Sequence, residues 1–230
     1  MKYGILFSVV SVLLVVSAVS HAGWFYFLLW PALSFGVIAT GYFHFGSRVY
    51  GKSKAGVLSA INQLILLPYL TYLWSVWHLL RLIKRETAYD QLSENIFIGR
   101  RLLSHELPAE IDHVIDLTCE FTEPLALRRK SYYLFPILDG FVPTSDLLRG
   151  WLNEIADLHG TIFIHCAEGH GRTGLFAAAL LLHKGQFQNP DEALRFIRSK
   201  RSLVRLGSRQ MKMLNELQKF AQPHLSRDRQ

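Results

Sequence analysis

The chain has 230 residues, a formal net charge of +7 and only two cysteines. Two cysteines are too few for a disulfide-built secreted scaffold. The sequence shows no basic stripe with interleaved aromatic residues, so a nucleic-acid partner is not expected. The charges are unevenly divided, because residues 1–80 contain no Asp or Glu, whereas all 18 acidic residues lie in 81–230. The first part is typical of a membrane region and the second of a soluble domain.

Three apolar stretches make up the first part, at residues 4–20, 24–45 and 57–80. A membrane-spanning helix needs about 20 apolar residues, a length that the second and third stretches reach and the first only approaches. The first stretch also resembles a cleavable signal peptide, since Lys2 precedes its apolar core and Ser20-His21-Ala22 follows it. Because the second stretch begins almost at once, a tight helical hairpin is the preferred interpretation.

Basic residues flank these stretches at Lys2, within 48–54 and within 81–85. Three full spans would put 48–54 and the segment after residue 80 on opposite sides of the membrane, against the positive-inside rule. Two spans and an interfacial or re-entrant third segment, which Pro68 would permit, would place every basic group in the cytoplasm. We therefore expect a multi-pass membrane anchor over 1–80, followed by a cytoplasmic domain.

A linker is expected at 81–93, an α/β domain at 94–222 and a short tail at 223–230. Within the domain, short apolar runs alternate with patterns of helical spacing. The predicted strands are 95–99, 113–118, 132–138 and 161–165. The predicted helices are 145–158, 174–183, 191–199 and 210–221. This alternation predicts a mostly parallel central sheet flanked by helices.

The most informative segment runs from Ile164 to Thr173, with the sequence IHCAEGHGRT. Here a buried strand is predicted to end at His165, and a helix to begin near Arg172 after a loop that contains two glycines. Successive backbone N–H groups in such a loop form an anion-binding nest, and the helix N-terminus adds partial positive charge. Arg172 supplies a planar fork that can hold two phosphate oxygens.

Cys166 lies at the start of this loop. A helix N-terminus and a neighbouring arginine favour the thiolate form of a cysteine, which is a strong nucleophile. An isolated cysteine at a strand end would be structural, but here it occurs together with the glycines and the arginine. We therefore predict that Cys166 attacks a phosphate and forms a cysteinyl-phosphate. The predicted phosphate-binding residues are Ala167, Glu168, Gly169, His170, Gly171 and Arg172.

The pattern His165-Cys166-x-x-Gly169-x-x-Arg172-Thr173 resembles the signature of the protein-tyrosine and dual-specificity phosphatase superfamily. The resemblance covers about residues 94–222, and the segments 98–100 and 114–118 resemble the opening strands of dual-specificity domains. It implies a compact phosphatase fold, a mechanism that needs no metal or other cofactor, and a phosphorylated protein or lipid as substrate.

The resemblance also implies roles for single residues. Asp139 matches the general acid on the loop upstream of the cysteine, with a turn-forming aspartate as the alternative. Thr173 matches the hydroxyl residue that assists departure of the thiolate, or caps the helix. His165 matches the histidine that orients the loop. Gln210 resembles a water-positioning glutamine or is an exposed residue at a helix start, and Cys119 is either a redox partner of the nucleophile or a buried strand residue.

Substrate class stays open between two alternatives. Membrane anchoring favours a lipid phosphate, such as a phosphatidylglycerophosphate-like molecule, whereas the compact fold equally suits phosphotyrosine or phosphoserine/threonine proteins. Glu168 departs from the lysines that lipid-directed members often carry, which weakens the case for a polyanionic inositol lipid. The alternative function is a pseudophosphatase that binds phosphate without turnover, and the presence of Cys166, Arg172 and Asp139 argues against it. Thiolate chemistry favours a reducing compartment, in keeping with the cytoplasm.

Overall fold

In the computed structural model, which describes residues 2–221, the chain divides into two compact units. The first comprises the residues up to Glu86 together with Cys119–Glu123, and the second comprises Thr87–Thr118 and the chain from Pro124 onward. The expected tail at 223–230 lies outside the described residues.

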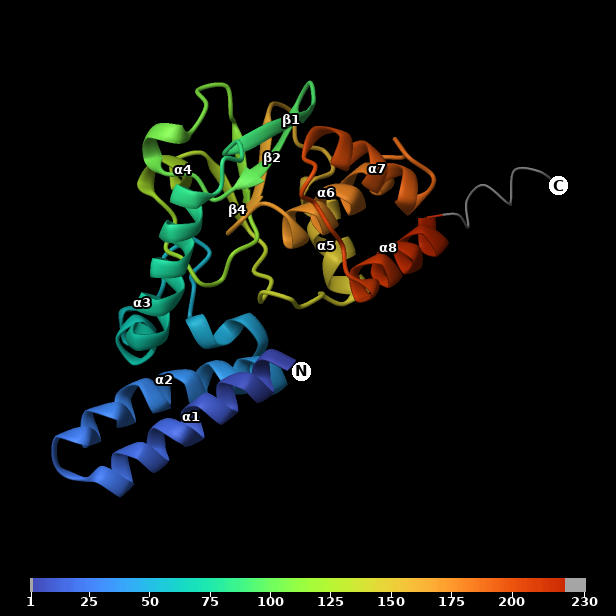
Figure 1. Cartoon of the computed structure of the whole chain (residues 1–230). Coiled ribbons are helices and arrows are strands. Elements are labelled where there is room, and N and C mark those ends of the chain that lie inside the picture. The colour runs from blue at the N-terminus through green and yellow to red at the C-terminus, as the bar shows by residue number, and fades with distance from the viewer. Residues whose placement is uncertain (1, 222–230) are drawn as a thin grey trace. The chain divides into compact units, whose positions relative to one another are not determined.

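The first unit begins with a helical hairpin (Figure 1). Helix α1 (Lys2–His21) and helix α2 (Leu29–Thr40) lie side by side and are joined by the 3-10 helix η1 (Gly23–Leu28). The Ser11 hydroxyl donates a hydrogen bond to the Ala32 carbonyl at 2.7 Å, which ties the two helices together. After α2 the chain continues through the π-helical turn η2 (Gly41–Phe45) and the 3-10 helix η3 (Gly46–Tyr50).

Helix α3 (Ala60–Ile83) contains Pro68, which cannot donate a backbone hydrogen bond to the Leu64 carbonyl. That carbonyl instead accepts a hydrogen bond from Trp30 Nε1 at 3.1 Å. The backbone N–H of Tyr69 donates to Ser34 Oγ at 3.2 Å. Side chains from α2 therefore bind backbone groups next to the proline, which stabilises an apolar helix around a residue that would otherwise weaken it.

Two described segments, Lys2–His21 and Gly23–Tyr50, are long and apolar enough to cross a membrane, and α3 is not among them. In α1 only Gly4 and Ala18 are buried, so its apolar side chains are exposed around most of the helix.

The segment Cys119–Glu123 was expected to belong to the domain at 94–222, but its contacts group it with the first unit. Trp74 Nε1 donates to the Glu120 carbonyl at 3.1 Å, and the Trp77 and Phe121 rings lie 5.3 Å apart. The two tryptophans of α3 thus offer a donor and an apolar surface to this loop, a long-range contact that no local pattern in the sequence reveals.

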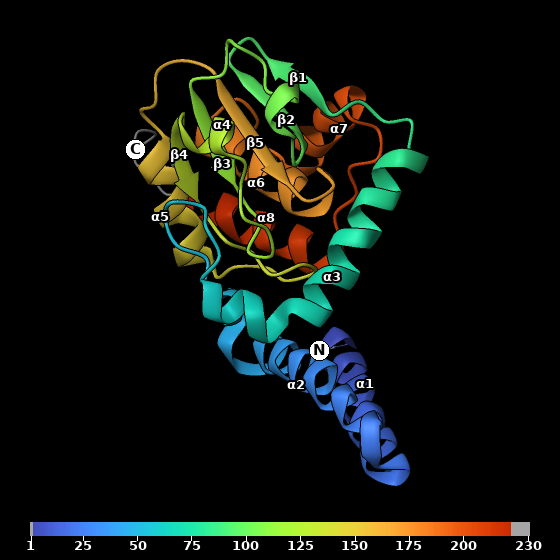
Figure 2. The same ribbon diagram turned by 90° about the vertical axis from the view of Figure 1, so that its left-hand side faces the viewer.

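The second unit contains a five-stranded sheet in the order β1-β2-β5-β3-β4 (Figure 2). All neighbouring pairs are parallel except β1 and β2, so the expected mostly parallel sheet is confirmed. The strands are β1 (Tyr89–Ser93), β2 (Ile96–Arg100), β3 (His113–Asp116), β4 (Ser131–Leu134) and β5 (Ile162–Cys166).

Strand β1 lies where a linker was expected. Its sequence, YDQLS, has one fully buried side chain, Leu92, and it pairs with only one neighbour because it forms the edge of the sheet. A turn of two residues, Glu94 and Asn95, connects it to β2 as an antiparallel hairpin. An edge strand needs little apolar surface, and for this reason its polar sequence gave no strand signal.

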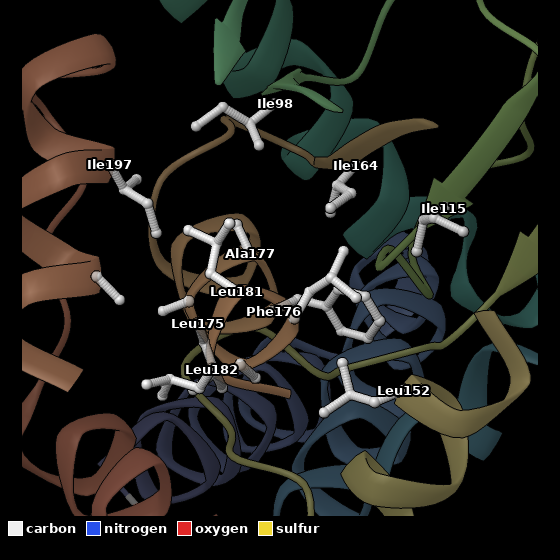
Figure 3. Packing of buried hydrophobic residues seen from close by; sticks show 14 of the residues in the cluster. Ile98, Ile115, Leu152, Ile164, Leu175, Phe176, Ala177, Leu181, Leu182 and Ile197 are labelled. Atoms are coloured by element: carbon white, nitrogen blue, oxygen red, sulfur yellow. The ribbon is translucent and has the colours of Figure 1, made fainter. Parts of the chain in front are cut away.

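Side chains alternate between the two faces of the sheet. Ile98, Ile115 and Ile164 lie in one apolar cluster with residues of the helices that cover this face (Figure 3). Phe97, Val114 and Phe163 lie in a second cluster with residues of the connecting segments, which include the short helices α4 (Leu125–Arg128) and η4 (Ser104–Glu106). The helices of the first face are α5 (Ser145–Ile155), α6 (Gly171–His183), α7 (Pro190–Lys200) and α8 (Ser208–Ala221).

Helix α6 is enclosed by the other helices and the sheet, since every residue from Arg172 to Leu182 is buried. This burial explains why its sequence is apolar on all sides rather than along one stripe. The loop that follows β5 therefore joins two elements that are both buried.

We predict that Phe176→Ala lowers the free energy of unfolding by about 3–5 kcal/mol, because a fully buried aromatic side chain is replaced by a cavity. The Phe176 ring stacks on Phe135, with ring centroids 5.6 Å apart. Denaturant unfolding of the purified protein measures the change. Leu147→Ala, at an exposed position of α5, is the control and should change stability by about 0.5 kcal/mol or less. Equal effects of the two substitutions would contradict this packing.

Candidate active site

The loop between β5 and α6 lies at the carboxyl end of the central strand. Strand β5 is buried along its whole length and is flanked by β2 and β3. Its last residue, Cys166, is opposite Arg100 of β2 and is 3% exposed. In parallel α/β sheets this end of the strands is where ligands bind, and here it coincides with the N-terminus of α6.

The loop backbone is turned so that an N–H group faces the sulfur. The Gly169 N–H donates to Cys166 Sγ at 3.2 Å, while the Ala167 carbonyl accepts from the Arg101 N–H at 3.3 Å. Gly169 has a φ of +76°, and a Cβ there would lie 2.3 Å from the carbonyl carbon of Gly99. Only glycine fits this position, because both the backbone angle and the approach to β2 exclude a side chain.

Arg172 and Asp139 lie together beside the loop. Arg172 is 4% exposed, and its Nη1 donates to the Ile137 carbonyl at 3.0 Å. Its Nη2 is 3.5 Å from Asp139 Oδ1, while the Asp139 side chain is 68% exposed. The structure therefore brings the predicted phosphate-binding arginine next to the predicted general acid, on a segment that follows β4 and contains the left-handed Gly140.

His165 is fully buried on the face of the sheet opposite α6. Its ring stacks on Phe163, with centroids 5.2 Å apart, and its Nε2 is 4.0 Å from Asp116 Oδ1. The Asp116 carboxylate is itself held by the Tyr132 hydroxyl at 2.5 Å and the Thr118 N–H at 2.7 Å. The imidazole is therefore shielded from solvent between Phe163 and Asp116, and its orienting role stays a prediction.

Thr173 and Gln210 both lie near the loop. Thr173 is fully buried, and its hydroxyl donates to the Gly99 carbonyl at 3.4 Å. The amide of Gln210 lies close to the loop, since a Cβ on Gly171 would be 3.7 Å from Gln210 Nε2. Gln210 Oε1 accepts from the Gly207 N–H at 3.0 Å, which holds the side chain at the start of α8.

Glu168 and His170 are the loop residues with polar side chains at the surface. Their side chains face one another, with His170 Nδ1 3.8 Å from Glu168 Oε2, and the Glu168 side chain is 40% exposed. Cys119 belongs to the first unit, where it is buried, is not in a disulfide and lies with its Sγ 3.3 Å from Glu120 Oε2. Its redox role therefore stays a prediction.

Arg201 is a contact of the loop that the sequence did not reveal. Its guanidinium donates to the carbonyl oxygens of Glu168 and Gly169, at 3.3 Å and 2.9 Å. In the sequence it is one of several basic residues at the end of a predicted amphipathic helix, a position where arginines are ordinarily solvated. Because its partners in the loop are backbone carbonyls, no residue type in the loop signals the contact.

Comparison with known proteins identifies the catalytic domain of dual-specificity phosphatases. The family profile described as "Dual specificity phosphatase, catalytic domain" matches residues 104–220. A curated relative, the probable protein tyrosine phosphatase type IVA B of Dictyostelium discoideum, is 36% identical over 85 residues, which are 34% of this chain and 50% of the relative. The chain thus matches only half the length of that relative.

Solved structures share the fold of the second unit. The active form of Tk-PTP is 25% identical with a TM-score of 0.51, over 57% of this chain and 97% of that one. PTPMT1 in complex with PI(5)P is 19% identical with a TM-score of 0.51, over 58% of this chain and 96% of that one. At this level of identity the second likeness concerns the fold alone.

We predict that Gly169→Ala reduces phosphatase activity at least tenfold, because the added Cβ would push the loop away from Gly99 and turn its N–H groups. Gly185→Ala is the matched control: its φ is also positive, at +68°, but nothing lies within 4 Å of an added Cβ. That control should lose about 1–2 kcal/mol of stability from the left-handed backbone and keep its activity. Hydrolysis of a small aryl phosphate measures both, and an active Gly169→Ala enzyme would contradict the loop geometry.

Proposed function

We propose that this chain, which belongs to the dual-specificity phosphatase family, hydrolyses phosphomonoesters through a cysteinyl-phosphate on Cys166. The observation that carries the proposal is the surrounding of the Cys166 sulfur. A backbone N–H of the loop points at it from 3.2 Å, at the N-terminus of a buried helix that begins with Arg172 in its first turn. These groups are placed to bind the phosphate that the Cys166 sulfur attacks.

In the first step the loop N–H groups and the Arg172 guanidinium hold the nonbridging oxygens of the phosphate. The Cys166 thiolate forms a bond to phosphorus, and the bond between phosphorus and the leaving oxygen breaks. The Asp139 carboxylic acid donates its proton to that oxygen, so the product leaves as a neutral alcohol. Asp139 suits this role because it is exposed to incoming substrate and lies beside Arg172.

In the second step the Asp139 carboxylate accepts a proton from a water molecule as the water attacks phosphorus. The bond between sulfur and phosphorus breaks, inorganic phosphate leaves, and the thiolate is restored. The Gln210 amide, which lies close to Gly171, would position this water. The Thr173 hydroxyl, which donates to the Gly99 carbonyl in this structure, would turn toward Cys166 Sγ to stabilise the departing thiolate.

We further propose that α1 and α2 anchor the enzyme in a membrane. Exposed apolar side chains around α1, such as Val12, Leu13 and Val19, are unfavourable in water and match a lipid environment. Helix α3, which is not among the candidate spans, would then lie at the interface. This arrangement places Lys2, residues 48–54 and 81–85 on the cytoplasmic side and obeys the positive-inside rule. The catalytic domain would face the cytoplasm.

We propose that the substrate carries a single phosphate, on a lipid such as a phosphatidylglycerophosphate-like molecule or on a protein. The support is the Glu168 side chain of the loop, which is 40% exposed and whose negative charge would repel additional phosphate groups. The likeness to PTPMT1, whose structure was solved with PI(5)P, makes lipid monoesters a reasonable first set to test.

We predict that Glu168→Lys increases the rate on a polyphosphoinositide about fivefold relative to a phosphotyrosine peptide, since a repulsive charge becomes attractive. Glu154→Lys, at an exposed position of α5, makes the same change in net charge away from the loop and serves as the control. Phosphate release from both substrates gives the ratio. An equal rise in the two variants would show that total charge, not Glu168, sets the preference.

We predict that Cys166→Ser abolishes turnover and that Asp139→Ala lowers kcat about 10²–10⁴-fold, as expected for loss of a general acid. Asp146→Ala removes another exposed aspartate, which pairs with Arg149 on α5, and should leave activity unchanged. The assay is phosphate release from a phosphotyrosine peptide and a phosphatidylglycerophosphate-type lipid in detergent, with EDTA present. Phosphate binding without turnover in the wild type would instead support the phosphate-binding pseudophosphatase.

A further inference from the structure

Arg201 is a buried arginine at the end of α7 for which the proposed mechanism has no role. It is 1% exposed, and a charged guanidinium is almost never buried so completely unless its donors are paired. Its hydrogen-bond partners therefore indicate what it does.

One side of the guanidinium faces β1 and the residues before it. Nη1 donates to Asp90 Oδ2 at 2.7 Å and to the Thr87 carbonyl at 3.2 Å. The Thr87 hydroxyl donates to the other Asp90 oxygen at 2.8 Å, which fixes the carboxylate. The buried positive charge is thus neutralised and anchored at the edge of the sheet.

The other side of the guanidinium faces the phosphate loop. Nε donates to the Gly169 carbonyl at 2.9 Å, and Nη2 donates to the Glu168 carbonyl at 3.3 Å. One rigid fork therefore holds two consecutive peptide groups of the loop and ties them to Asp90. A lysine has no such fork and cannot make the same set of hydrogen bonds at once.

Because the peptide bonds are planar, these two carbonyl contacts determine where the next two N–H groups of the loop point. In a trans peptide the carbonyl oxygen of one residue and the N–H of the next point in opposite directions. With the Glu168 carbonyl held toward Arg201, the Gly169 N–H must point away from it, and it is this N–H that donates to Cys166 Sγ. By the same rule, the Gly169 carbonyl directs the His170 N–H toward the loop interior.

We propose that Arg201 is a positioning residue of the phosphatase, which holds the loop N–H groups toward the phosphate from outside the site. The proposal rests on the proposed function of the loop. Arg201 does not touch the substrate, so its effect on catalysis passes entirely through the orientation of the Glu168 and Gly169 peptide groups. In its absence those carbonyls are free to rotate inward, where they would repel an anion.

The test measures binding of inorganic phosphate through the protection that it gives Cys166 against alkylation by iodoacetamide. The variants are Arg201→Met, which removes the charge and the donors at similar size, and Arg201→Lys, which keeps the charge. Ile197→Ala is the matched control, because Ile197 is buried in the apolar cluster on the same helix. This substitution should lower stability without removing a contact to the loop. Thermal unfolding in detergent and kcat and KM on an aryl phosphate are recorded for each.

We expect Arg201→Met to weaken protection by phosphate about tenfold or more, from the loss of two charge-assisted hydrogen bonds to the loop, with a lower kcat and a higher KM. Protection by phosphate in Arg201→Lys should be intermediate between Arg201→Met and the wild type. If Arg201→Met does not fold, the comparison of Arg201→Lys with the wild type tests the proposal. Ile197→Ala should unfold at a lower temperature but bind phosphate as the wild type does.

Two other results would distinguish failure of the Arg201 inference from failure of the proposed function. If the Arg201 variants unfold at lower temperature yet bind phosphate within about twofold of the wild type, Arg201 is only structural and the inference is overturned. If phosphate does not protect the wild-type enzyme and the wild type shows no turnover, the proposed function itself is overturned, and this inference with it.

Discussion

The orientation of three successive peptide groups decides what the loop after β5 can bind. The carbonyl oxygens of Ala167, Glu168 and Gly169 are each held outward, the first by the Arg101 N–H and the other two by Arg201. In trans peptides the following N–H groups must then point inward, where one of them already donates to Cys166 Sγ. The anion site we propose thus depends on what contacts the outside of the loop as much as on the side chains within it.

The fold could be predicted from the sequence wherever elements bury enough apolar surface to show a period. The strands near 96–100, 113–116 and 162–166 and the helices of 145–155 and 190–200 follow the expected patterns closely. Strand β1 was missed because an edge strand with one buried side chain has almost no apolar signal. The grouping of Cys119–Glu123 with the first unit was missed because it depends on Trp74 and Trp77, more than 40 residues away.

The candidate site likewise contains residues that the sequence predicts and residues that it does not. Nucleophilic attack and phosphate binding require particular residue types at a fixed spacing. The motif therefore indicated Cys166 and Arg172 directly. Asp139 was indicated by the resemblance, which implies a general acid on a loop upstream of the cysteine, and it lies next to Arg172. Gly99 packs against the backbone of Gly169, and Arg201 donates hydrogen bonds to two carbonyls of the loop. Backbone atoms are the same in every residue type. Contacts of this kind leave no complementary residue in the sequence and become visible only in three dimensions.

The central claim is that phosphate passes through Cys166, and trapping the intermediate tests it most directly. Wild-type enzyme and the Asp139→Asn variant are mixed with a phosphotyrosine peptide, quenched in acid within milliseconds to seconds, and digested for mass spectrometry. The account predicts one added phosphoryl group on the Cys166-containing peptide of the wild type. In the Asp139→Asn variant this group should form more slowly, because the leaving oxygen no longer receives a proton. Turnover of the substrate without any phosphoryl group on that peptide at any quench time would contradict the mechanism.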